Sequence, residues 1–134
     1  MVCSFCDLIT RPDDLGIVDV GADTAALLDH APVFFGHALV VPIVHVEHLL
    51  VAPSELAAMI MVRTQEVARA AMLAYHADGI LTVINSIISQ SVPHLHIHVI
   101  PRRRGDGLRG FLWPRRRYPT DATLADHRNA LGLG

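Results

Sequence analysis

The sequence has no lysine, only two cysteines, few aromatic residues and no long apolar run. Pro42, His45 and Asn85 interrupt the longest apolar stretches before they reach the roughly 20 residues of a membrane helix, so no membrane span is expected. The N-terminus lacks a basic start followed by a long apolar segment, which predicts no signal peptide and a cytoplasmic location. With 51% apolar residues in 134 positions, the chain should fold as one globular domain.

The two cysteines, Cys3 and Cys6, lie three positions apart. In a cytosolic protein such a pair more often binds a metal or performs redox chemistry than forms a structural disulfide. Because there is no lysine, the 11 Lys and Arg positions are all arginines, and seven of them lie between Arg102 and Arg117 beside one acid, Asp106. This basic segment could attract phosphate-bearing ligands or nucleic acid, or it could be a solvated loop.

Short β-prone segments bounded by glycine, proline or turn residues predict five strands, over residues 16–20, 25–28, 36–42, 80–84 and 94–100. Apolar residues at helical spacing predict one long helix from Pro53 to about residue 76, with Ser54 as a candidate cap. A short helix is expected over 122–131. This order indicates an α+β fold, with a mostly antiparallel sheet covered by the long helix.

Three histidines alternate in the predicted strand over 94–100, namely His94, His96 and His98. Because residues two apart in a strand point the same way, the three imidazoles should share one face while Leu95, Ile97 and Val99 enter the core. Two chemistries fit such a row. One is metal binding, and the other is nucleophilic and acid–base catalysis. The spacing alone does not separate them.

Residues 90–100, which read QSVPHLHIHVI, resemble the signature of the histidine-triad (HIT) superfamily. Further similar segments are the Cys-x-Phe-Cys motif of residues 3–6, the segments 27–32, 36–42 and 45–47, and the bacterial Hint-like tail of residues 101–107 with Trp113. The resemblance covers about residues 3–113. It implies a single HIT domain over 1–134, in which residues 114–134 form a C-terminal tail.

The resemblance also implies a reaction. His96 would attack the α-phosphorus of a nucleotide, forming a nucleotidyl-histidine intermediate that water then hydrolyses. His98 would contact the phosphate, with help from Ser91 and backbone amides near Gln90, and His37 on the adjacent strand would support the catalytic histidines. An imidazole suits the nucleophilic role because it is largely unprotonated at neutral pH.

The nucleotide-binding set implied by the resemblance is Phe5, Leu8, Leu27, Asp29, His30, Asn85, Gln90, Ser91 and His98. Within it, Asp29 would accept hydrogen bonds from the ribose hydroxyls, although an aspartate before a turn is often only a turn-former. Phe5, Leu8 and Leu27 would form an apolar slot for the base.

The resemblance also implies a zinc site that is found in some bacterial members of the family. The matching residues are Cys3, Cys6, His45 and His94. Two thiolates and two imidazoles suit tetrahedral zinc. His48 competes with His45 as the fourth ligand, since the two lie three residues apart. We expect a structural Zn²⁺ and no organic cofactor.

The sequence departs from the family pattern in two places. The loop over residues 85–91 is about two residues shorter than usual and contains no glycine, and Ile43-Val44 stands where a lysine is common. Glycine lets backbone approach a phosphate closely, so these changes bear on phosphate binding and on the assignment of Asn85.

The leading hypothesis is a purine-nucleoside phosphoramidase of the Hint type that acts on nucleotide conjugates. Alternatives are a Fhit-type hydrolase of dinucleoside polyphosphates, a nucleotide-binding regulatory module with little turnover, and a zinc hydrolase in which the triad itself holds the metal. The expected partners are a purine nucleotide or conjugate and a second copy in a homodimer, with neither membrane nor nucleic acid involved.

Overall fold

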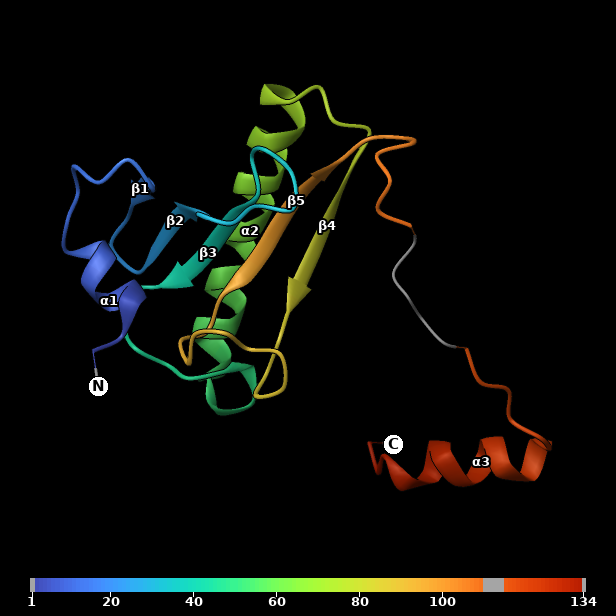
Figure 1. Cartoon of the computed structure of the whole chain (residues 1–134). Coiled ribbons are helices and arrows are strands. Elements are labelled where there is room, and N and C mark those ends of the chain that lie inside the picture. Colours follow the sequence, from blue (N-terminus) through green and yellow to red (C-terminus); the bar gives the residue numbers. More distant parts are fainter. Residues whose placement is uncertain (1, 110–114, 134) are drawn as a thin grey trace.

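Figure 1 shows the computed structural model, in which one long helix lies across an antiparallel sheet. The structure describes residues 2–109 and 115–133, so Trp113 lies outside the described residues. The strands are β1 (Ile17–Val20), β2 (Thr24–Leu28), β3 (Ala38–Pro42), β4 (Gly79–Ile84) and β5 (Ile97–Arg102). The helices are α1 (Ser4–Ile9), α2 (Ser54–Ala74), α3 (Asp121–Ala130) and the short 3-10 helix η1 (Leu49–Val51).

The sheet has five strands in the order β1-β2-β3-β5-β4, and each neighbouring pair is antiparallel. The predicted α+β class, with a mostly antiparallel sheet, a long helix and a short C-terminal helix, is confirmed. No helix in the described parts of the chain combines the length and the hydrophobicity that crossing a bilayer requires.

The two faces of the sheet pack against different helices. Alternate residues of β3 and β5 join Ile60 of α2 in one core cluster, which includes Val40, Leu95, Ile97 and Val99. The other face carries Ala25, Leu27, Leu39 and Val41, against which Phe5 and Leu8 of α1 pack. His98 pairs with Leu39 across β3 and β5. Because directly opposite residues of an antiparallel pair share a face, His98 lies on the α1 side of the sheet.

Helix α2 buries one stripe of its surface, made by Leu56, Ile60, Thr64 and Ala71. The spacing of four or seven residues places these side chains over β3 and β5. The predicted cap at Ser54 is wrong. Pro53 is the N-cap, and it makes no side-chain capping bond. The fixed φ of proline suits this first turn, and Ser54 is already helical.

The sequence did not predict α1, which is only six residues long. Cys3 caps it, because the Cys6 N–H donates to Cys3 Sγ over 3.5 Å. An isolated helix of this length would not form in water. Phe5 and Leu8 hold it in place by packing on the sheet.

Strand β5 starts and ends later than predicted. It begins at Ile97 rather than His94 and continues through Pro101, which pairs with Ile80 of β4. Proline lacks an N–H, so a central strand normally excludes it. The β3–β5 register ends at Ala38↔Val99, and Pro101 therefore pairs on one side only.

Before β3, Gly36 has φ 90°, and a Cβ there would collide with the Tyr75 ring.

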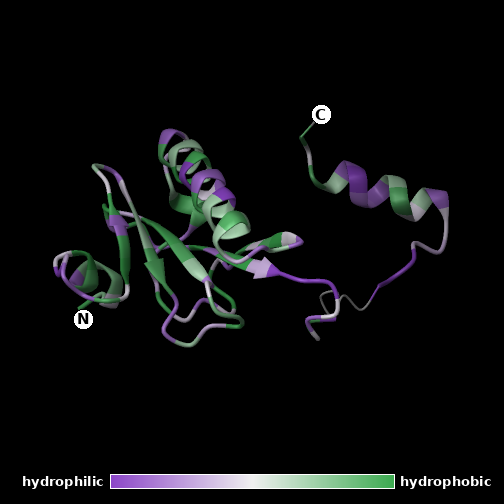
Figure 2. Ribbon diagram, turned by 90° about the horizontal axis from the view of Figure 1, so that it is seen from above, coloured by the Kyte–Doolittle hydropathy of each residue, from purple (hydrophilic) through white to green (hydrophobic). Residues whose placement is uncertain are grey.

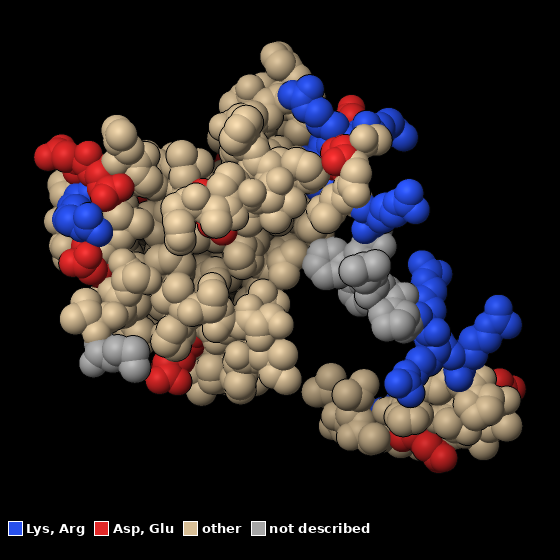
Figure 3. All heavy atoms as spheres, viewed as in Figure 1, with Lys and Arg blue, Asp and Glu red and all other residues tan. Residues whose placement is uncertain are grey.

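The C-terminal helix α3 stands clear of the sheet (Figures 1 and 2). Thr120 caps it by accepting from the Thr123 N–H over 3.1 Å. Its hydropathy is mixed along its length, whereas the strands are mostly apolar (Figure 2). Most of the arginines visible in Figure 3 gather on the side of the molecule that leads from β5 to α3.

Candidate functional site

A cavity of about 240 Å³ opens on the α1 side of the sheet. Its lining comes from α1 and the turn after it, from the ends of β2 and β3, and from the segment before β5. The lining residues are Ser4, Phe5, Leu8, Arg11, Asp29, His30, Leu39, Ser91, Val92, His96 and His98. A second hollow of about 300 Å³ beside Phe34, Phe35 and Tyr75 holds no histidine or cysteine, so the smaller cavity is the candidate active site.

His96 is held in one tautomer by the backbone. Its Nδ1 lies 2.7 Å from the carbonyl oxygen of His94, and the side chain is buried. A carbonyl only accepts, so Nδ1 carries the proton and Nε2 keeps a free lone pair. The ring also packs edge-on against Phe5, with centroids 5.2 Å apart. This arrangement presents an unprotonated nitrogen in the cavity, as a nucleophile requires.

His37 holds His98 in the opposite tautomer, with the proton on Nε2. The Val33 N–H donates to His37 Nδ1 over 3.1 Å, so the proton of a neutral His37 is on Nε2. That N–H points at His98 Nδ1, 2.9 Å away, which leaves the proton of His98 on its own Nε2. His98 therefore offers a donor in the same cavity in which His96 offers a lone pair.

Burial keeps both His37 and His98 neutral. It lowers the pKa of His37, against the opposing charge of Asp29. Burial, together with the neighbouring His96 and His37 rings, lowers the pKa of His98 to about 4, against the opposing charge of Asp29. A neutral His98 remains an Nε2–H donor across the physiological range.

Asp29 both stabilises its own turn and faces His37. Its Oδ1 accepts from the Ala31 N–H over 2.9 Å, which is the turn-forming role open to this residue. Its Oδ2 lies 3.5 Å from His37 Nε2, and the side chain is 17% exposed in the cavity wall. The second oxygen therefore retains lone pairs that a ligand hydroxyl can use.

Among the described residues, two groups of side chains are close enough to hold a metal ion: Asp29, His37 and His98, and the four residues Cys3, Cys6, His45 and His94. The first group is poorly suited. Its His37 Nδ1 already accepts a backbone N–H, so the Nε2 that faces the cluster carries a proton and has no lone pair for a metal. This hydrogen bonding argues against a metal ion held by Asp29, His37 and His98.

The second group has the donors of a zinc site. Cys3 Sγ lies 3.4 Å from His94 Nδ1, and Cys6 Sγ lies 3.5 Å from both His94 Nδ1 and His45 Nδ1. A tetrahedral zinc ion with ordinary bond lengths would separate sulfur and nitrogen by about 3.6 Å. The His94 Nε2–H donates to the Pro42 carbonyl over 2.8 Å, so Nδ1 is the lone-pair nitrogen. These residues fit the metal.

The structure favours His45 over His48 as the fourth member of this group. The cluster of donor atoms includes His45 and not His48. His48 instead precedes η1, and its Nδ1 is buried without a hydrogen-bond partner among the described residues. Burial also lowers the pKa of His94, which keeps that ring in the neutral form that a metal ligand needs.

The zinc group and the nucleophile are joined through the segment before β5. The Leu95 N–H donates to the Val46 carbonyl over 2.7 Å, next to His45. His94 contributes its ring to the zinc group and its carbonyl to His96. The residues that would bind the metal therefore hold the backbone that orients His96.

The glycine-free loop is strained. Ile87 has φ 72° and Ser89 has φ 61°, in the left-handed region where a β-branched residue is rare. Gln90 ties the loop down. Its Oε1 accepts from the Ile87 N–H over 3.0 Å, and its Nε2 donates to the Glu47 carbonyl over 2.5 Å. Both ends of its amide are thus used within the protein.

Some sequence-predicted binding residues lie away from the cavity wall. Leu27 is fully buried beneath α1, and Leu39 of the adjacent strand takes its place in the lining. Asn85 directly follows β4, and neither it nor Gln90 lines the cavity. Phe5, Leu8, Asp29, His30, Ser91, His96 and His98 do line it, and His37 lies behind His98.

Arg11 is a lining residue that the sequence analysis missed. It follows Phe5 and Leu8 at a spacing of three, which would have indicated a shared helical face had α1 been predicted. Within the arginine segment, Arg102 is committed to Asp106. Two bonds of 2.6 and 3.0 Å join them, and they lower the pKa of Asp106 to about 2. Arg103, Arg104 and Arg109 are exposed.

A family model, a sequence relative and two solved structures all place the similarity of this chain in one family. The model of the HIT domain matches residues 18–105. An adenosine 5'-monophosphoramidase of Schizosaccharomyces pombe is 32% identical over 117 residues, covering 85% of this chain and 84% of that protein. The crystal structure of a HIT family member from Bacillus subtilis superposes with a TM-score of 0.82 at 31% identity, covering 100% of this chain and 99% of that one. A zinc-bound histidine triad protein from Mycobacterium smegmatis has a TM-score of 0.75 at 34% identity, covering 97% and 98%.

Proposed function

Since this chain belongs to the HIT family, we propose that it hydrolyses or transfers nucleotidyl groups at the α-phosphate of purine nucleotide conjugates, with His96 as the nucleophile. The observation that carries the proposal is the pair of opposite tautomers in one cavity. His96 presents a lone pair on Nε2, and His98 presents an N–H. The phosphoramidase named among the relatives supports the substrate class.

The reaction has two displacements. In the first, His96 Nε2 attacks the α-phosphorus, the bond from phosphorus to the leaving nitrogen breaks, and the departing amine takes a proton from solvent. In the second, water attacks phosphorus, the bond to Nε2 breaks, and a nucleoside monophosphate leaves as the water releases a proton. The His98 N–H would stabilise the negative charge on the phosphoryl oxygens in both steps.

Asp29 and the apolar wall would place the nucleotide for this attack. The free Oδ2 of Asp29 can accept from ribose hydroxyls. Phe5 and Leu8 on one side and Leu39 on the other offer an apolar slot for the base. We assign the structural zinc to Cys3, Cys6, His45 and His94, where the ion would cross-link α1 to the triad segment.

The test is turnover of an adenosine phosphoramidate by the wild type and by His96→Ala, with zinc content measured on both. We expect activity to be abolished while zinc is retained. His76→Asn is a matched control, because His76 is exposed at the end of α2 with φ 47°. Zinc loss in His96→Ala would instead support a metal held by the triad.

A binding module with little turnover is the second candidate, and the strained loop favours it. Loop 85–91, which contributes Ser91 to the cavity, holds two non-glycine residues at positive φ, Ile87 and Ser89. The same assay decides between the two, since tight nucleotide binding without turnover by the wild type would support the module.

We also infer a homodimer. Strand β4 lies at the edge of the sheet, where its outer backbone groups could pair with a second copy, and α3 stands apart from its own sheet. Light scattering of the purified protein tests this, and a monomer at micromolar concentration would contradict it.

A further inference from the structure

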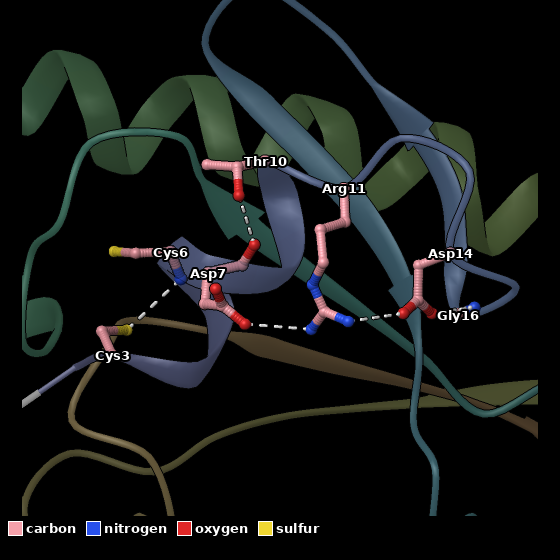
Figure 4. A network of polar contacts seen from close by, with 7 residues as sticks. All are labelled: Cys3, Cys6, Asp7, Thr10, Arg11, Asp14 and Gly16. Atoms are coloured by element: carbon pink, nitrogen blue, oxygen red, sulfur yellow. Dashed lines mark hydrogen bonds and ion pairs between the residues drawn. The ribbon is translucent and has the colours of Figure 1, made fainter.

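Arg11 is fixed at the rim of the cavity by two carboxylates (Figure 4). Its Nη2 lies 3.0 Å from Asp7 Oδ2, and its Nη1 lies 3.1 Å from Asp14 Oδ2. A guanidinium has five N–H groups. The two bonds leave its Nε–H and one N–H on each terminal nitrogen available to a ligand.

The position of Arg11 identifies the part of a ligand that it would meet. Phe5 lies beside His96, with ring centroids 5.2 Å apart, so the N-terminal end of α1 is the end nearest the nucleophile. Leu8 follows one helical turn later, about 5 Å further along the axis. The Arg11 N–H donates to the Leu8 carbonyl over 2.9 Å, which continues the path by another turn. The Arg11 backbone therefore lies beyond Leu8, on the side away from His96, and its guanidinium reaches back to Asp7 of α1 while lining the same cavity.

The charge around Arg11 argues against a phosphate ligand. One guanidinium faces two carboxylates, a local sum of −1, and the cavity rim there does not attract an anion. A neutral ligand group with two adjacent acceptors would suit the remaining N–H groups. Guanine presents such a pair in O6 and N7, whereas adenine presents N7 beside an amino donor.

We propose that Arg11 is a specificity-determining residue that gives the site a preference for guanine over adenine. The inference rests on the proposed nucleotide-binding function. Arg11 bonds O6 and N7 of a base whose faces lie in the apolar slot of Phe5, Leu8 and Leu39. The Arg11 side chain is 55% exposed, so the preference should be at the lower end for a bidentate contact, about five- to tenfold in Kd.

The experiment is calorimetric titration of the wild type, Arg11→Gln and the control Arg69→Gln with GMP, IMP and AMP. Arg69 is exposed on α2 and does not line the cavity. We expect the wild type and Arg69→Gln to bind GMP and IMP similarly, and both about five- to tenfold more tightly than AMP. IMP keeps O6 and N7 but lacks the amino group. A glutamine suits the edge of adenine, so Arg11→Gln should bind AMP at least as tightly as GMP.

Equal binding of GMP and AMP by the wild type, or a guanine preference that survives in Arg11→Gln, would overturn the inference and leave the proposed function standing. Failure of all three nucleotides to bind the wild type would overturn both. Exposed ion pairs contribute little to stability, so Arg11→Gln should fold normally. An unchanged circular dichroism spectrum and zinc content would verify this.

Discussion

Replacing His37 by alanine removes the residue that fixes the tautomer of His98. His37 is 3% exposed, accepts from the Val33 N–H and donates to His98 Nδ1. The variant removes the partners of the His98 Nδ1 and the Val33 N–H, of which the less exposed His98 should cost about 1–3 kcal/mol, and it opens a cavity. We expect a loss of roughly 3–5 kcal/mol in the free energy of unfolding, which a domain of ordinary stability survives.

The effect on catalysis should exceed what instability explains. Without His37, His98 can place its proton on Nδ1 and turn a lone pair toward the phosphoryl oxygens. Removing one such donor costs about 100- to 1,000-fold, and partial misorientation should cost about 10- to 100-fold in kcat. KM should change little, because Asp29 and the apolar slot remain.

The assay is steady-state kinetics on an adenosine phosphoramidate, together with urea unfolding, for His37→Ala and His37→Gln. A glutamine amide can accept at its oxygen and donate at its nitrogen, so it should recover part of kcat. A folded alanine variant with kcat within about twofold of wild type would show that His37 does not orient His98 for catalysis, as would a glutamine variant no better than alanine.

Three further predictions concern the metal, pH and the loop. Cys6→Ser should lose zinc on dialysis against a chelator, whereas His48→Ala should keep it; the reverse result would assign the ligands differently. Because the folded pKa of His98 is about 4, below the ordinary histidine value of 6.5, only the unfolded chain binds this proton between those values. The free energy of unfolding should therefore fall as pH drops through this window, by at most about 1.4 kcal/mol per pH unit, and less steeply in His98→Asn; equal slopes in urea titrations would contradict this. Ile87→Gly should stabilise the protein by about 1 kcal/mol because Ile87 has φ 72°. The control Ile88→Gly should destabilise it, and a loss of stability in Ile87→Gly would refute the assigned strain.

The sheet and α2 were predictable because their patterns are long or sharply bounded. The expected strand over 80–84 and the observed β4 differ by one residue, and α2 ends within about a turn of its prediction. The long helix follows from apolar residues repeated over its whole length. Helix α1 could not be predicted in this way, because six residues carry too little periodicity and its stability comes from packing on the sheet.

At the site, the sequence predicted which residues gather but not how each one is used. His37 and His98 lie side by side as expected, since their segments are neighbours in the sheet. Gln90 bonds the backbone of Ile87 and Glu47 instead of lining the cavity. Leu39 lines the cavity in place of the expected Leu27 for a different reason. The strand pattern gives the face on which a side chain lies, whereas its exposure depends on where α1 packs.

The most direct test of the account is to trap the covalent intermediate. The wild type would be mixed with an adenosine phosphoramidate, quenched with acid-free denaturant within milliseconds, digested and mapped by mass spectrometry, with phosphorus NMR identifying the bonded ring nitrogen. We expect an adenylyl group on His96, attached through Nε2, because Nδ1 is bonded to the His94 carbonyl at 2.7 Å. An adduct on another residue, or turnover with inversion of configuration at phosphorus and no adduct, would contradict it.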